Sequence, residues 1–147
     1  MRRLLAVNGL LLASLAAVIL GVQLTDRGAA QVDTSVRRYA AAVSTGNLDA
    51  AVQEIAPPAR PRWRDWIAGQ LGNVYEVRGV AVRAPSLLDR FTRHTASAPS
   101  EVTVALDVNR GYPDEFYQPT PRVPVQQVDG RWYLVEPLLA PEAVLSS

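Results

Sequence analysis

The chain has 147 residues and a mass of 16.0 kDa, which is the size of one domain once an N-terminal targeting segment is set aside. Its 48% hydrophobic and 20% charged residues are typical of a globular chain and exclude a disordered one. The formal net charge is +1, and from Gln31 onward 12 Arg stand against 13 acidic residues. So balanced a charge disfavours a nucleic-acid-binding protein.

Three residue types needed for particular chemistry are missing or nearly so. The chain has no Cys, all of its basic residues are Arg, and His94 is its single histidine. These counts exclude disulfides, thiolate catalysis and Schiff-base lysines, and they disfavour zinc sites, which require several His or Cys ligands. We therefore expect neither a cofactor nor a metal.

The first apolar stretch, Leu4 to Leu24, contains no charged residue and is long enough to span a bilayer as a helix. Arg2 and Arg3 precede it, and the positive-inside bias holds them in the cytoplasm. We predict a cytoplasmic segment 1–3, a transmembrane anchor 4–24 and a spacer 25–33, so that the rest of the chain is extracytoplasmic. The localisation expected is therefore a single-pass membrane protein.

A cleaved secretory signal is the alternative for this stretch, with Gly28-Ala29-Ala30 as the small-residue cleavage site. The apolar run is longer than the 7 to 15 residues usual for such signals, which favours an uncleaved anchor. Cleavage itself stays open. Both alternatives place the remaining residues outside the cytoplasm.

Three amphipathic helices follow in chain order. Asp33-Thr34-Ser35 offers an N-cap for the first, and Gly46 ends it. Asn47 can cap the second, which ends before Pro57-Pro58. The third begins near Pro61 and ends at Gly72-Asn73.

From Val74 the hydrophobic period changes from 3.6 to 2, which predicts strands. Tyr75 and Val77 have the opposite parity to Val80 and Val82, and a β-bulge at Gly79 would return both pairs to one face. Residues 102–108 alternate between apolar and polar, as in a sheet with unlike faces. Residues 84–100 are predicted to continue the first strand through Leu87-Leu88 and then to form a loop.

The last strands form a hairpin across Asp129-Gly130, because Asp-Gly accepts the positive φ angles of a two-residue turn. Residues 126–128 should pair with residues 131–133, after a run of turn residues at 109–120. Pro121 and Pro124 lack an amide proton, which predicts an edge or bulged strand and not a central one.

Three helices followed by about four antiparallel strands predict an α+β domain over residues 34–140, with the helices packed on one face of a curved sheet, and a C-terminal tail at 141–147. With its RRYAAAVSTGNLDAAVQEI and DGRWYLVEP segments, the chain resembles the nuclear transport factor 2-like superfamily. The resemblance implies a cone of sheet around a long helix, with a pocket at its open end.

Aromatic residues on the expected helix and strand faces are the candidates for lining this pocket: Tyr39, Trp63, Trp66, Tyr75 and Trp132. Burial in the core is the other interpretation of the same pattern. Trp63 and Trp66 with Arg60, Arg62 and Arg64 could instead lie against anionic lipid head groups, or the arginines could form a solvated face.

Superfamily members similar to ketosteroid isomerases use an aspartate base and hydroxyl or acid donors. The corresponding candidates are Asp107 as base and Tyr112, Tyr117 or His94 as donor. Asp107, however, has the parity of the polar face, opposite the valines. No residue matches a catalytic motif of the family, so we assign none as catalytic.

The function expected is therefore a membrane-tethered extracytoplasmic binding or accessory domain without catalytic activity. Its partner would be a protein or a small apolar ligand. The alternative is a small-molecule isomerase, cyclase or hydrolase that uses a pocket carboxylate. The oligomeric state is left open by the sequence.

Overall fold

The computed structural model describes residues 28–83, 100–111 and 116–141. The chain divides into two units at Ala30 and Gln31, and the fold below is that of the second. The predicted anchor at 4–24 and the expected Leu87-Leu88 extension lie outside the described residues. No helix within the described ranges combines the length and the apolar character needed to cross a bilayer.

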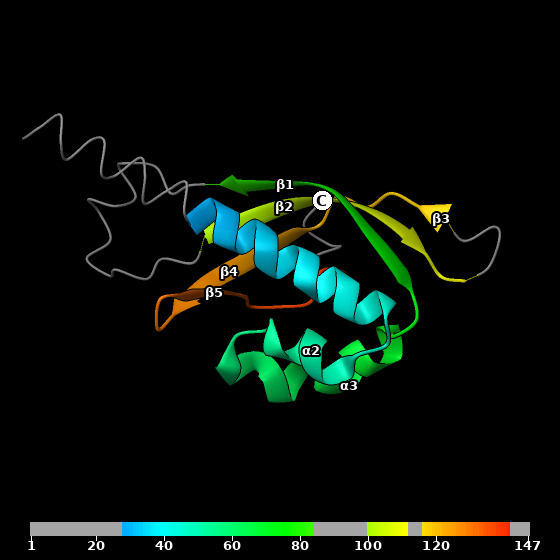
Figure 1. The fold of residues 1–147 in the computed structure, drawn as a ribbon, viewed down its shortest axis with the longest axis horizontal. Coiled ribbons are helices and arrows are strands. Elements are labelled where there is room, and N and C mark those ends of the chain that lie inside the picture. Colours follow the sequence, from blue (N-terminus) through cyan, green and yellow to red (C-terminus); the bar gives the residue numbers. More distant parts are fainter. Residues whose placement is uncertain (1–27, 84–99, 112–115, 142–147) are drawn as a thin grey trace, which may run out of the picture. The chain divides into compact units, whose positions relative to one another are not determined.

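The first helix, here called the long helix, is described over residues 28–44 (Figure 1). It is longer than predicted, because Asp33 and Ser35 do not cap it. Asp33 forms an ion pair with Arg37 one turn on, at 3.0 Å, and the Ser35 hydroxyl donates to the Trp132 carbonyl at 3.0 Å. At the other end the prediction is confirmed, since Gly46 has a φ of 72° and terminates the helix.

Two shorter helices follow as predicted. Helix α2, Leu48–Gln53, is capped by Asn47, whose side chain accepts from the Ala50 amide at 3.1 Å. A 3-10 turn, Pro57–Ala59, leads into α3, Arg60–Gln70. Gly72, with a φ of 89°, ends this hairpin of helices.

The strands are β1 (Val74–Arg83), β2 (Ser100–Asn109), β3 (Phe116–Tyr117), β4 (Arg122–Val128) and β5 (Arg131–Leu134). They form one antiparallel sheet in the order β1-β2-β4-β5, and β3 pairs with the end of β2. The two-residue β3 lies in the stretch for which the sequence predicted only turn residues. It forms because β2 continues past β4 and leaves a free edge there.

The predicted bulge in β1 is confirmed. The register shifts between Val77, which pairs with Leu106, and Gly79, which pairs with Ala105, so Arg78 is the extra residue. Tyr75 is buried, and Val77, Val80 and Val82 pack against the core from the same strand. A bulge bends a strand as well as restoring its phase, which suits a sheet that curves over a helix.

The hairpin of β4 and β5 has the predicted register, with Gln126 opposite Tyr133 and Val128 opposite Arg131. Asp129 and Gly130 have φ angles of 50° and 78°. The prediction that its prolines mark an edge strand is wrong, since β4 lies between β2 and β5. The Pro124 carbonyl accepts from the Val135 amide, just beyond the end of β5. The amide proton that Pro124 lacks would lie at the same place, past the last paired residue of β5.

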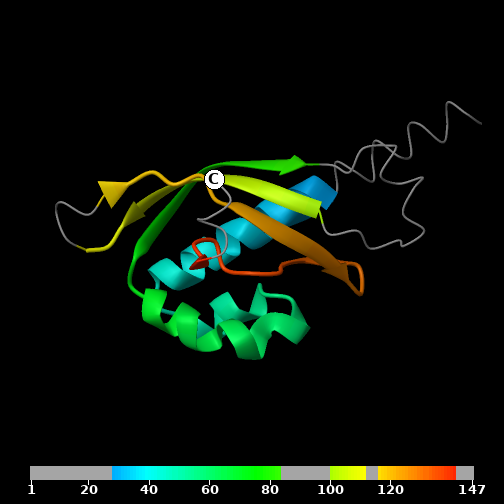
Figure 2. The same ribbon diagram turned by 180° about the vertical axis from the view of Figure 1, so that it is seen from behind.

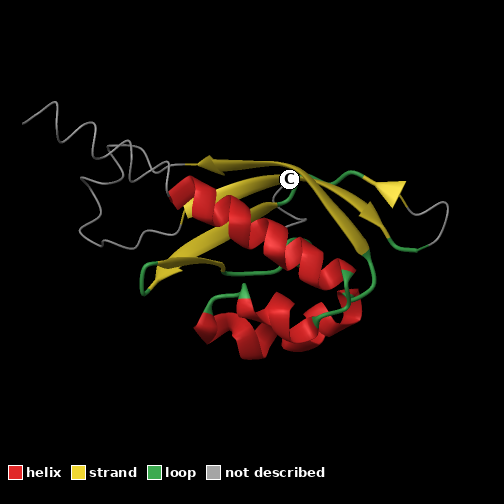
Figure 3. Ribbon diagram, in the orientation of Figure 1, coloured by secondary structure: helices red, strands yellow, loops and turns green. Residues whose placement is uncertain are grey.

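The core lies between the long helix and the sheet, which the helix crosses in Figures 1 and 3. On β2 the inward side chains are fully buried, as the alternating pattern predicted; they are Val102, Val104, Leu106 and Val108. After β5 the chain passes on the sheet side of the long helix, in red in Figure 2, and buries Leu138 and Leu139. The described fold is thus α+β, with helices on a curved antiparallel sheet, as predicted.

Replacing Asn47 by Ala should lower the free energy of unfolding by about 1 kcal/mol, because the Ala50 amide loses its capping acceptor. Asn47→Ser, which keeps an oxygen at the cap, should cost only a few tenths of that. Urea unfolding followed by circular dichroism measures both. Equal losses in the two variants would contradict the capping role.

Candidate functional site

The aromatic residues predicted to line a pocket divide into a core group and a marginal group. Tyr39, Trp63 and Tyr75 are buried, while Trp66 and Trp132 are half-buried and pack against the edge of the core. Trp63 and Trp66 meet edge to face, with ring centroids 6.4 Å apart. Trp132 lies instead in the β4–β5 hairpin, where its carbonyl accepts a hydrogen bond from the Ser35 hydroxyl.

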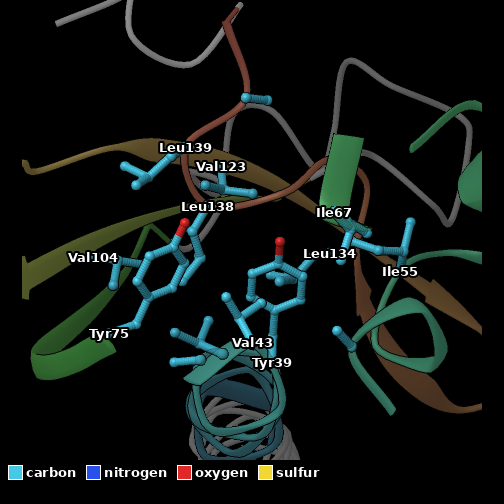
Figure 4. Close-up of a cluster of buried hydrophobic side chains, with 14 of the residues drawn as sticks. Tyr39, Val43, Ile55, Ile67, Tyr75, Val104, Val123, Leu134, Leu138 and Leu139 are labelled. Carbon is cyan, nitrogen blue, oxygen red and sulfur yellow. The ribbon is translucent and has the colours of Figure 1, made fainter. Parts of the chain in front are cut away.

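Tyr39 and Tyr75 come from the long helix and from β1, and both hydroxyls point toward the segment that carries Leu138 and Leu139 (Figure 4). Val43, Val104 and Leu134 surround the same space. Tyr39 is 0% exposed and Tyr75 is 6% exposed. These two rings therefore fill the interior between helix and sheet and act as core residues there.

The two hydroxyls differ in their partners. The Tyr75 hydroxyl donates to Oε1 of Gln70 at 3.3 Å, whereas the Tyr39 hydroxyl is buried without a hydrogen-bond partner among the described residues. Burial raises the pKa of Tyr75 to about 12. Burial, with a smaller effect from neighbouring Tyr75, raises the pKa of Tyr39 still further above its ordinary range.

The carboxylate considered as a base does not face this interior. Asp107 lies on the opposite face of β2 from the buried valines, as its parity predicted, and its Oδ1 forms an ion pair with Nε of Arg78 at 2.7 Å. Of the donors considered with it, Tyr117 accepts from Arg110 at 3.3 Å. His94 and Tyr112 lie outside the described residues.

The arginines of α3 are held by the protein itself. Arg60 donates to the carbonyls of Ile55 and Gln53, both at 3.0 Å. Arg64 forms an ion pair with Asp49 at 2.9 Å, and the Arg62 guanidinium lies 4.6 Å from the centre of the Trp63 ring. These contacts give α3 a self-paired basic face, which weakens the case for contact with lipid head groups.

A groove that the sequence did not predict lies between the long helix and α2, with a volume of about 280 Å³. Small side chains make up much of its lining. The residues around it are Arg38, Ala41, Ala42, Thr45, Asn47, Ala50, Gln53 and Glu54. The sequence places alanines on both helices, but the way the helices pack, which leaves Ala41 exposed and Ala50 half-buried beside the groove, is a feature of the tertiary structure.

Glu54 is the unusual member of this lining, because its side chain is only 7% exposed. Oε1 accepts from Nη2 of Arg131 at 2.8 Å, while Oε2 is buried and has no hydrogen-bond partner in the described structure. The main chain around Glu54 is paired with β5: the Glu54 carbonyl accepts from the Leu134 amide at 3.0 Å, and the Ala56 amide donates to the Leu134 carbonyl at 2.8 Å. The chain leaving α2 is therefore bound to β5.

The sequence matches no protein-family model, and no curated protein matches it either.

Tyr39→Phe should leave the free energy of unfolding unchanged or raise it by up to about 1 kcal/mol, because it removes a buried hydroxyl that has no partner in the part of the chain that the structure describes. The matched variant Tyr75→Phe loses a hydrogen bond to Gln70 and should be destabilised by about 0.5 to 1.5 kcal/mol. Chemical denaturation of the two variants compares them directly. Destabilisation of Tyr39→Phe by more than Tyr75→Phe would show that the Tyr39 hydroxyl has a partner.

Stability should fall as the pH rises from 10 to 12. The pKa of Tyr75 is about 12 in the folded protein and near 10 in the unfolded chain, so the unfolded chain loses its proton first as the pH rises. With no Lys in the sequence, tyrosines are the side chains that titrate in this window. Urea midpoints across it should decline less in Tyr75→Phe than in the unaltered protein, and an identical decline would refute the assignment.

Proposed function

We propose that residues 34–140 form a nuclear transport factor 2-like domain that is tethered to the membrane by residues 4–24 and faces the extracytoplasmic side. The uncharged stretch Leu4–Leu24 and the preceding Arg2 and Arg3 support the tether and its orientation. The order of helices before strands, with a long helix against a curved antiparallel sheet, supports the family.

Within this proposal the domain binds a partner protein and is not catalytic. The observation that carries this is the filled interior, where Tyr39 and Tyr75 occupy the space beneath Leu138 and Leu139. A small apolar ligand would have to displace packed side chains there, so binding on the outer surface is favoured. The alternative acid–base enzyme is less supported, because it requires a carboxylate in the apolar interior and Asp107 lies on the other face with Arg78.

At one end of the sheet the outer face presents a row of three residues, of which Val74 and Phe116 are apolar and Asn109, between them, is polar. Val74 pairs with Asn109, and Asn109 pairs with Phe116, so the three residues lie side by side across β1, β2 and β3. Val74 is 52% exposed and Phe116 is 56% exposed. Exposed aromatic side chains are enriched at protein interfaces, and we assign this row as the partner-contacting surface.

A photoreactive phenylalanine analogue placed at position 116 of the full-length protein in its membrane should give a discrete cross-linked adduct. The same analogue at exposed position 49 on α2, away from the row, serves as the control and should not. Val74→Ser should reduce the yield of the adduct at least several-fold while leaving the unfolding midpoint unchanged. An adduct that forms equally from both positions, or that ignores Val74→Ser, would exclude this surface.

A separate experiment tests the tether by determining on which side of the membrane the C-terminus lies. A reporter enzyme that is active only outside the cytoplasm, fused to the C-terminus of the full chain, should show activity. The protein should also resist extraction from membranes by carbonate. Leu12→Arg together with Ala16→Arg should release the protein into the soluble fraction, because charges at the centre of a spanning helix are costly. Release of the unaltered protein by carbonate would refute the anchor.

A further inference from the structure

We propose that the groove between the long helix and α2 binds a small monocarboxylate with a short alkyl chain, and that the Arg38 guanidinium is its charge partner. This inference goes beyond the partner surface and the tether proposed above and depends on neither. Three features of the groove carry it: the unpaired charge of Arg38, the internal pairing of Glu54 with Arg131, and the methyl groups between the two helices.

Arg38 is the basic residue of the groove lining, and no described residue balances its charge. Its side chain is exposed, and it forms no hydrogen bond or ion pair with any residue that the structure describes. The other arginines of the described helices are held by a carboxylate, by backbone carbonyls or by an aromatic ring; they are Arg37, Arg60, Arg62 and Arg64. A guanidinium stays ionised and presents its N–H donors as a planar fork that matches a carboxylate. Arg38 therefore offers such a fork to an anion from outside the protein.

The carboxylate of Glu54 does not cancel this charge. Its side chain is only 7% exposed, and Oε1 accepts from Nη2 of Arg131 at 2.8 Å, so these two residues form a neutral pair within the protein. The positive charge of Arg38 is left over. Because opposite charges attract more strongly where water is partly excluded, the groove favours a monoanion over a neutral molecule or a cation.

The lining sets the shape of the ligand. Residues of the long helix at successive helical spacings form one side of the groove; they are Arg38, Ala41, Ala42 and Thr45. At 1.5 Å of rise per residue this row is about 10 Å long. After the turn at Gly46, α2 runs back along the long helix (Figure 1) and adds the methyl group of Ala50. A carboxylate bound to Arg38 can thus lay its alkyl chain along the alanines.

The size of the groove limits the length of that chain. Its volume of about 280 Å³ is several times the roughly 30 Å³ that one water occupies, and it lies just under the range of about 300 to 1,000 Å³ typical of sites for larger ligands. An acid of a few carbon atoms matches this volume, whereas a long-chain fatty acid would extend out of the groove.

Butyrate, butyramide and n-propylammonium carry the same propyl chain and differ in charge, which makes them matched probes for the full-length protein in zwitterionic detergent micelles at constant ionic strength. Amide resonances of Ala41, Ala42 and Ala50 should shift saturably with butyrate, with a dissociation constant in the millimolar range, as so small a ligand allows. Butyramide and n-propylammonium should bind at least ten-fold more weakly. Equal binding of the three probes, or no saturable shift with butyrate, would overturn the proposal.

Arg38→Gln should weaken butyrate binding at least ten-fold, because it removes the charge while keeping a polar side chain at an exposed position. Arg83→Gln, the same change at an exposed arginine of β1 outside the groove lining, should leave binding unaltered. Equal effects of the two changes would refute the role of Arg38.

Ala50→Met lengthens a side chain of the lining while Arg38 is retained, and it should also weaken butyrate binding at least ten-fold. Undiminished binding in this variant would place the carboxylate outside the groove and refute the site.

Discussion

Enclosure of one face of the long helix is the constraint on which the rest of the structure depends. Tyr39 on that face is fully buried, so the sheet has to bend around the helix and cannot remain flat. The bulge at Arg78 provides part of this bend and keeps the apolar residues of β1 on the inner side. Arg37 reaches from the helix to the Val77 carbonyl at 3.1 Å, which ties the helix to the bulged strand.

The same constraint governs how α2 leaves the helix layer. The chain leaves α2 at Glu54, and Ile55 pairs with Leu134 of β5, which is the edge strand of the sheet. This connection carries a polar side chain into a mostly buried position. Arg131, which follows Gly130 of the hairpin turn, donates to one oxygen of that carboxylate, Oε1 of Glu54. The other oxygen, Oε2, has no hydrogen-bond partner among the described residues.

An interior occupied by tyrosines and leucines shifts the expected site of binding to the surface. The Tyr39 hydroxyl is buried and has no hydrogen-bond partner among the described residues, but Tyr39 is 0% exposed and packs beneath the segment that carries Leu138, so it is a core residue. The exposed row at Phe116 and the groove beside Glu54 lie on different elements of the fold.

Local signals in the sequence by themselves determined the order of the helices and of the four longer strands, the Asn47 cap, the bulge near Gly79 and the Asp129-Gly130 turn, because each depends on residues close together in the chain. Tyr39 and Tyr75 are buried in the core, one of the two interpretations that the sequence allowed, and the chain after β5, which returns on the sheet side of the long helix, contributes to this burial. Tertiary structure alone decided that Glu54 is buried beside Arg131, 77 residues away in the chain, since no periodicity records which distant strand a helix end will meet.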